Sequence, residues 1–104
     1  MKKSITLVAV IGAASMHTPA FADAALAEKS GCMACHQLDK KLVGPGLAEV
    51  AAKYAGQPDA EAKLTVSIKA GGAGKWGPIP MPASSNVSDA DLKTLAVWVL
   101  SVGK

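Results

Sequence analysis

Apolar residues recur at helical spacing in four separate segments of this chain. The first predicted helix begins at Asp23, a residue type suited to an N-cap, and continues to about residue 31. The second covers residues 47–54, where Leu, Val, Ala and Tyr follow the helical period, and Gly56 and Pro58 then end it.

The other two predicted helices lie on either side of a long loop. The third begins near Asp59 and runs to residue 71, and the fourth begins at Ser88, an N-cap followed by acidic residues, and closes at Gly103. Residues 71–87 between them are rich in proline and glycine, and so long a loop in a small domain suggests a functional role. No segment alternates as a strand would, so the predicted fold class is all-α with about four helices.

The N-terminal residues have the features of a secretory signal. Lys2 and Lys3 make a short basic start, and an apolar run follows over residues 4–14. Ala20 and Ala22 then supply the A-x-A pattern that signal peptidase reads. The alternative is an uncleaved membrane anchor, but the apolar run is too short for a span. We therefore expect residues 1–22 to be a cleaved signal peptide and residues 23–104 to form one domain.

Removal of that signal changes the charge and leaves a small, aromatic-poor domain. Residues 23–104 hold nine lysines, no arginine and eight acidic residues, a net charge of +1. This near-neutral balance gives little support to a nucleic-acid or anionic-membrane role. Only Tyr54, Trp76 and Trp98 are aromatic in this range. A domain of this size usually needs a further stabilising element, and a large apolar cofactor would fill its interior.

The strongest chemical signal is the sequence Cys-Met-Ala-Cys-His at residues 32–36. Two thiols three residues apart can each bond a vinyl group of one haem, and the adjacent His36 then supplies an imidazole nitrogen to the iron. The motif predicts one haem c per chain, attached covalently through Cys32 and Cys35.

Other uses of the two thiols fit this sequence less well. A thioredoxin-like dithiol needs a βαβ setting, and no strand pattern is present. A zinc site needs two more ligands, but residues 23–104 contain no further Cys or His. A disulfide between Cys32 and Cys35 would close a small, strained ring.

The second axial ligand of the iron is predicted by elimination. Met33 and Met81 are the two methionines of residues 23–104. Met33 lies inside the attachment turn, on the same side as His36, so its sulfur cannot reach the opposite face of the iron. Met81 stands in a loop with three prolines, which restrict the backbone and hold one side chain in a fixed place. We predict Met81 as the ligand, so that both axial positions of the iron are filled.

Several motifs, in this order, resemble those of the short class I monohaem bacterial cytochromes c, the group that includes electron donors to periplasmic nitrite reductase. The resemblance covers nearly all of residues 23–104 and rests on residues 32–36, 43–45, 50–56, 76–82 and 95–100. It implies four helices wrapped around one haem, with the first and last helices packed across each other.

The same resemblance implies roles for individual residues. The carbonyl of Pro45 is expected to accept a hydrogen bond from Nδ1 of His36, and the indole N–H of Trp76 is expected to donate to a haem propionate. Relatives place an Asn near the axial Met. This chain departs from their pattern because Asn86 follows a segment one residue longer than usual.

These features predict a diffusible periplasmic electron carrier and not an enzyme. It would cycle one His/Met-ligated iron between Fe(II) and Fe(III) and exchange electrons with respiratory-chain proteins, a reductase or an oxidase. The alternative is a haem enzyme or ligand-binding sensor with an open sixth position, but an enzyme would need an acid–base group near the iron, and no distal His or Arg is available. We expect a monomer that binds no nucleic acid and has no stable membrane anchoring after signal cleavage.

Overall fold

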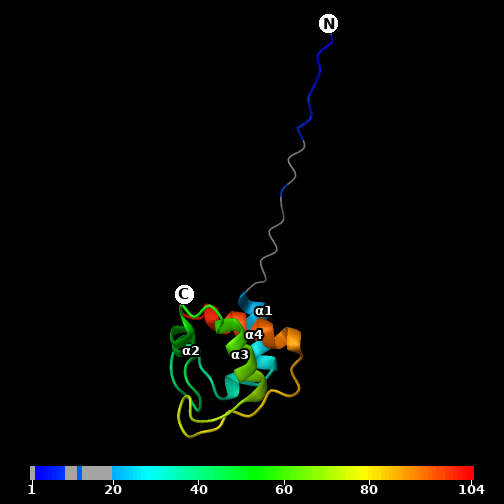
Figure 1. The fold of residues 1–104 in the computed structure, drawn as a ribbon. Helices are drawn as coiled ribbons and strands as arrows, with labels where there is room; N and C mark the ends of the chain where they lie inside the picture. The colour runs from blue at the N-terminus through cyan, green and yellow to red at the C-terminus, as the bar shows by residue number, and fades with distance from the viewer. Residues whose placement is uncertain (1, 9–11, 13–19) are drawn as a thin grey trace.

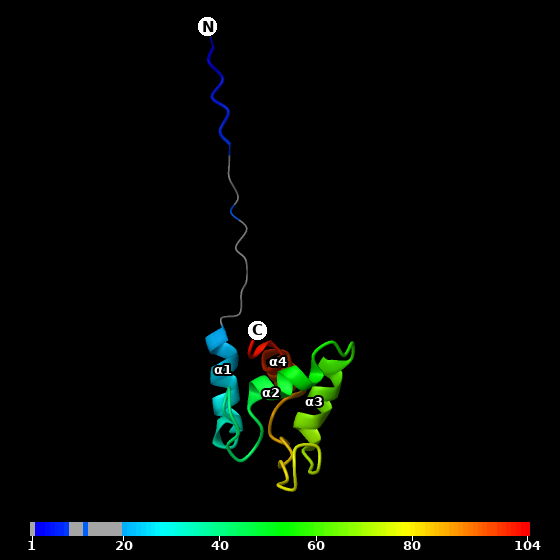
Figure 2. The same cartoon turned by 90° about the vertical axis from the view of Figure 1, so that its left-hand side faces the viewer.

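The computed structural model describes residues 2–8, 12 and 20–104 of the chain (Figures 1 and 2). Residues 2–8 and 12 form neither helix nor strand, and their side chains are exposed. Residues 9–11 and 13–19 of the predicted signal lie outside the described residues, and cleavage after Ala22 stays a prediction. Within the described ranges, no helix has the length and apolar character needed to cross a membrane.

Residues 20–104 fold into four α-helices and one short 3₁₀ helix. In chain order these are α1 (Ala20–Lys29), η1 (Cys32–Ala34), α2 (Leu47–Tyr54), α3 (Ala60–Ala70) and α4 (Asp89–Ser101). The extended pairing found in the described part of the chain is an isolated antiparallel bridge between Gly72 and Met81. The all-α prediction is therefore confirmed.

The predicted helix boundaries hold closely in the C-terminal three helices. α2 has the expected limits, and α4 starts after Ser88, whose Oγ accepts a hydrogen bond from the Asp91 amide at 3.2 Å. The prediction that Asp23 is the N-cap of α1 is wrong for the full-length chain, because α1 begins at Ala20. Alanine is the strongest helix former, so the residues upstream extend the helix. Asp23 then lies in the first turn, where a negative charge is favourable.

Helix α4 is the centre of the core. It contacts α1, α2 and α3, and Figure 1 shows it crossing α1 at the top of the domain. The α4 residues Leu92 and Ala96 are completely buried, as is Ala27 of α1. The expectation that the first and last helices pack across each other is therefore confirmed.

Two loops below the helices hold most of the predicted site residues. The loop of residues 35–46, which follows η1, lies below α1, and the loop of residues 71–82 lies below α3 (Figure 2). The first loop leads into α2 and the second leaves α3, so the packing of these helices fixes the distance between the two loops.

Candidate haem-binding site

The predicted attachment residues share a single turn of the main chain. Gly31 adopts a positive φ of 82°, which lets the chain pass directly from α1 into η1. The amides of Cys35 and His36 then both donate to the carbonyl oxygen of Cys32, at 3.2 and 3.0 Å. The two thiols are unpaired, and burial raises the pKa of the Cys32 thiol despite an opposing backbone hydrogen bond. This turn presents two thiols and an imidazole as one unit.

His36 is held by the loop that follows it. Its Nδ1 lies 2.8 Å from the carbonyl oxygen of Pro45, so the hydrogen bond expected from the resemblance is present. A carbonyl can only accept, which places the proton on Nδ1 and leaves Nε2 free to bind a metal. Gly44 packs against the ring, and a Cβ there would lie 2.6 Å from Cε1 of His36. The loop therefore fixes both the tautomer and the position of the imidazole.

Met81 is held by the end of α3, a contact that the sequence did not reveal. Its amide donates to the carbonyl of Gly72 at 2.8 Å, and the Gly72 amide donates back at 2.9 Å. Gly71 has a φ of 65° and a ψ of −157°, a conformation that essentially only glycine adopts. A Cβ on Gly71 would collide with the carbonyl oxygen of Met81. The Gly-Gly pair after α3 is the sequence signal for this close approach of two segments of the main chain.

A cavity of about 240 Å³ joins these two loops, many times the roughly 10–15 Å³ that one water molecule needs. His36 and Met81 both line it, together with Cys35 and Pro45. Apolar side chains from all three of the C-terminal helices complete the wall: Leu47, Val50, Leu64, Ile68 and Val99. Met33 packs against the core and is not among the residues that line this cavity.

The donors and the apolar lining of this cavity fit a c-type haem. An imidazole and a thioether are ligands that haem iron accepts, and apolar walls suit the ring of the cofactor. Cys35 lines the cavity, whereas Cys32 is half-buried against the core one turn away. Within the described residues, no carboxylate and no second imidazole lines the cavity.

A polar group of residues forms one edge of the cavity. Trp76 lines it and is half-buried, and Tyr54, Ser67 and Lys75 lie beside it. The Lys75 ammonium donates to Tyr54 Oη at 3.2 Å and to Ser67 Oγ at 3.3 Å. Burial raises the pKa of Tyr54, but hydrogen bonds with Lys75 and Ser67, and the charges of Lys75 and Lys53, bring its net pKa below the ordinary value of 10.0. Sequence reasoning did not connect these residues, since they come from three separate segments.

Asn86 lies away from this site. Its side chain is exposed in the turn before α4, and it does not line the cavity. The neighbouring Ser84 instead fixes the segment after Met81, because its amide is shared between the carbonyl oxygens of Ile68 at 3.3 Å and Lys69 at 3.2 Å.

Comparison with known proteins agrees with the fold. The model of the cytochrome c family matches residues 22–103. Cytochrome c-552 of Hydrogenobacter thermophilus is 52% identical to this chain, and the match covers 96% of this chain and 98% of the relative. Cytochrome c-551 of Pseudomonas aeruginosa is 57% identical, and the match covers 73% of this chain and 72% of the relative. The crystal structure of wild-type Nitrosomonas europaea cytochrome c552 has a TM-score of 0.74 and 54% identity, covering 76% of this chain and 98% of that chain.

The chain belongs to the cytochrome c family. Its likeness to cytochromes c-551 and c-552 makes it a small monohaem class I member, with one covalently attached haem c. Its role is that of an electron carrier with redox partners, and it is not an enzyme.

Proposed function

We propose that residues 23–104 form a diffusible periplasmic carrier in which His36 and Met81 hold the haem iron. One observation carries this proposal: two residues far apart in the sequence, with the ligand types that suit haem iron, line the same apolar cavity. Each is fixed by main-chain hydrogen bonds, His36 by Pro45 and Met81 by Gly72.

The other site residues have distinct tasks in this proposal. Cys32 and Cys35 form the thioether bonds, and the turn of η1 places His36 next to them. Pro45 keeps Nε2 of His36 directed to the metal and raises its basicity by accepting from Nδ1. Trp76, on the cavity wall, donates its indole N–H to a propionate. A haem bound here supplies an iron centre that gains or loses one electron.

The protein residues set the conditions for that transfer. The apolar wall would exclude water from the iron of a bound haem, and His36 and Met81 as its two ligands would leave no open position for a substrate. A thioether ligand favours Fe(II), so His/Met ligation raises the reduction potential. Because both ligands are held by backbone groups, the ligand set changes little between the two oxidation states.

The partners and the location follow from the surface and the N-terminal residues. Several apolar side chains of the two site loops are about half-exposed: Leu42 at 47%, Val43 at 44% and Ile79 at 59%. Electron-transfer encounters are small and weak, and an apolar patch of this kind is sufficient for docking to a reductase or an oxidase. A basic start, an apolar run and an A-x-A site support export with cleavage after Ala22. The mature chain is proposed to be a monomer.

The absorption spectrum of the ferric protein tests the ligand set. We expect low-spin iron and the weak charge-transfer band at the red end of the spectrum that a Met–iron bond produces. High-spin features without that band would contradict the proposal and favour an open sixth position, as in a haem enzyme or a sensor.

Mass spectrometry of the protein expressed in a bacterium with a haem-attachment system tests export. We expect the periplasmic fraction to contain a chain that begins at Asp23 and carries one haem. A full-length chain that stays with the membrane fraction would contradict the cleavage.

A further inference from the structure

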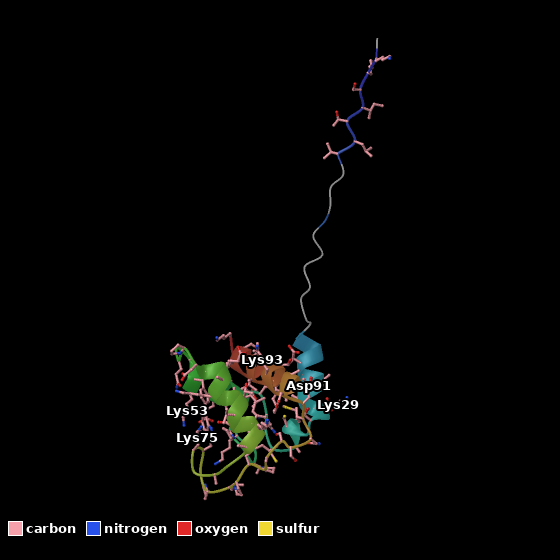
Figure 3. All side chains as sticks on the ribbon, turned by 45° about the vertical axis from the view of Figure 1, so that its right-hand side comes forward. Lys29, Lys53, Lys75, Asp91 and Lys93 are labelled. Carbon is pink, nitrogen blue, oxygen red and sulfur yellow. The ribbon has the colours of Figure 1, made fainter. Side chains whose placement is uncertain are left out.

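Two lysines lie close together, and one of them, Lys75, lines the cavity. Lys75 follows α3 and Lys53 belongs to α2, and Figure 3 shows both labels on the same side of the domain, above the loop of residues 71–82. The Lys53 ammonium lies 3.5 Å from the carbonyl oxygen of Lys75 and 4.4 Å from the centre of the Trp76 ring. The Lys75 ammonium lies 5.8 Å from the centre of the Tyr54 ring.

Neither ammonium has a carboxylate partner in the described part of the chain. The three ion pairs found there use other lysines: Lys63 with Asp59, Lys69 with Asp89, and Lys93 with Glu61. The lining of the cavity, as described, likewise contains no Asp or Glu. Lys75 therefore lies in the lining of a largely apolar cavity, as Lys41 does, and Lys53 lies next to Lys75 outside that lining. Within the described residues, no carboxylate of the protein balances the charges of Lys53 and Lys75.

The Lys75 ammonium has one hydrogen-bond donor more than its partners in the described residues accept. An ammonium group has three donors, and Tyr54 and Ser67 accept two of them. Lys75 itself lines the cavity, and the hydrogen bonds found among the described residues use two of its three donors. A carboxylate matches the third donor in charge and in hydrogen bonding.

We propose that Lys75, positioned by Tyr54 and Ser67 and supported by Lys53, binds a carboxylate of the haem at this edge of the cavity. The inference rests on the proposed function, which places the haem there. The apolar side chains of Leu64, Ile68 and Val99 suit the ring, and the polar edge is where the charged end of the cofactor finds donors.

This arrangement has a consequence for the iron. A positive charge beside the haem favours Fe(II) over Fe(III), and it offsets the negative carboxylate that favours Fe(III). Lys75 is therefore a cofactor-binding residue that raises the reduction potential, and its effect is internal to the protein. Such an effect differs from docking because it is present in the isolated carrier.

The test is the midpoint potential of the holoprotein with Lys75→Gln, Lys75→Arg and the control Lys63→Gln. Lys63 lines a neighbouring groove but pairs with Asp59, so it lacks the proposed role. We expect Lys75→Gln to shift the Fe(III)/Fe(II) equilibrium towards Fe(III) about three- to tenfold, equivalent to about 30–60 mV for one electron. Lys75→Arg keeps the positive charge, so its potential should stay close to that of the unmodified protein. Lys63→Gln should change the Fe(III)/Fe(II) equilibrium less than twofold.

A second measurement identifies the source of the carboxylate. Resonance Raman bands of the haem propionates should move in Lys75→Gln and not in Lys63→Gln. A Lys75→Gln protein with the Met–iron band intact, but with unchanged potential and propionate bands, would overturn this inference and leave the proposed function standing. An effect of Lys75→Gln confined to the salt-dependent rate with a partner would overturn it too, since the carboxylate would then belong to the partner. Loss of the Met–iron band in the unmodified protein would instead contradict the proposed function.

Discussion

The main chains of Gly72 and Met81 hydrogen-bond to each other in both directions, at 2.9 and 2.8 Å. This isolated bridge ties the candidate ligand to the residue just after α3, so the position of Met81 depends on the packing of that helix. His36 is held in a similar way, because its Nδ1 is bonded to the backbone carbonyl of Pro45. Both candidate ligands are thus positioned by main-chain groups.

Met81→Ala should leave the haem attached and free the sixth position of the iron. We expect the potential to fall, with a shift of the Fe(III)/Fe(II) equilibrium of at least about tenfold, or about 59 mV. The ferric iron should become high-spin or bind added cyanide more readily. Met33→Ala is the matched control, since Met33 packs against the core and does not line the cavity. An unchanged spectrum in Met81→Ala would show that another residue is the ligand.

Gly71→Ala should loosen Met81 without touching its side chain. The backbone conformation at Gly71 costs another residue about 1–3 kcal/mol, and its Cβ would also collide with the Met81 carbonyl. We expect the Tm to fall by about 5 °C or more and the Met–iron band to weaken as the protein is warmed. Gly74→Ala is the control, because Gly74 also has a positive φ but open space around its Cβ position. Equal effects of the two substitutions would mean that strain alone, and not the contact with Met81, matters.

Replacement of either cysteine should greatly reduce the folded protein. The cavity lies between α2, α3, α4 and the two loops, so a chain without its haem loses contacts to all of them. We expect Cys32→Ala and Cys35→Ala to lower the yield of soluble protein several-fold, with Met33→Ala in the same turn as control. Thermal unfolding followed by circular dichroism is the measurement. A cooperative transition in the haem-free chain would contradict the expectation that it is mostly disordered.

Ile79→Glu should weaken docking to redox partners. Ile79 is 59% exposed in the loop that also holds Met81, and a charge there would disrupt an apolar contact. We expect the second-order rate constant with a physiological acceptor to fall at least about fivefold, and the rate of the unmodified protein to depend weakly on ionic strength. Val97→Glu on α4 is the control, because Val97 is 48% exposed but does not line the cavity. A fall of several orders of magnitude with salt would mean that charge governs docking.

The ionisation of Tyr54 should report on Lys75. Hydrogen bonds and nearby lysines hold the pKa of Tyr54 below its ordinary value in spite of its burial. Lys75→Gln should therefore raise the Tyr54 pKa, whereas Lys63→Gln should leave it unchanged. The chain has a single tyrosine, so one ¹³C resonance of the labelled ring follows this titration by NMR.

The sign of the linked stability change follows from this shift. Between the folded pKa of Tyr54 and the unfolded value of about 10, the unfolded chain binds more protons, so Tyr54 adds stability as the pH rises. That contribution is lost as the pH falls through the folded pKa, and it should be smaller in Lys75→Gln. An identical Tyr54 pKa in both proteins would show that Lys75 does not contact the hydroxyl.

Local signals allowed most of the helices to be predicted. Gly56 and Pro58 end α2, and the Ser88 hydroxyl caps α4, because capping and helix breaking depend on residues close in sequence. The prediction of Asp23 as the N-cap of α1 is wrong for the full-length chain, since the residues before it also favour a helix. The first residue of α1 also depends on processing, because cleavage after Ala22 would remove Ala20, Phe21 and Ala22 from the helix.

The sequence by itself determined the four helices and the Cys-Met-Ala-Cys-His turn at residues 32–36, because each depends on neighbouring residues. Met81 as the second ligand stays a prediction, made by elimination among few candidates. Only the tertiary structure decided how Met81 is held, through the bridge to Gly72, and that Asn86 lies away from the cavity. It also brought Lys75 together with Tyr54 and Ser67 at the cavity edge. These contacts join segments far apart in the chain, and their formation depends on how the helices pack and not on any local pattern.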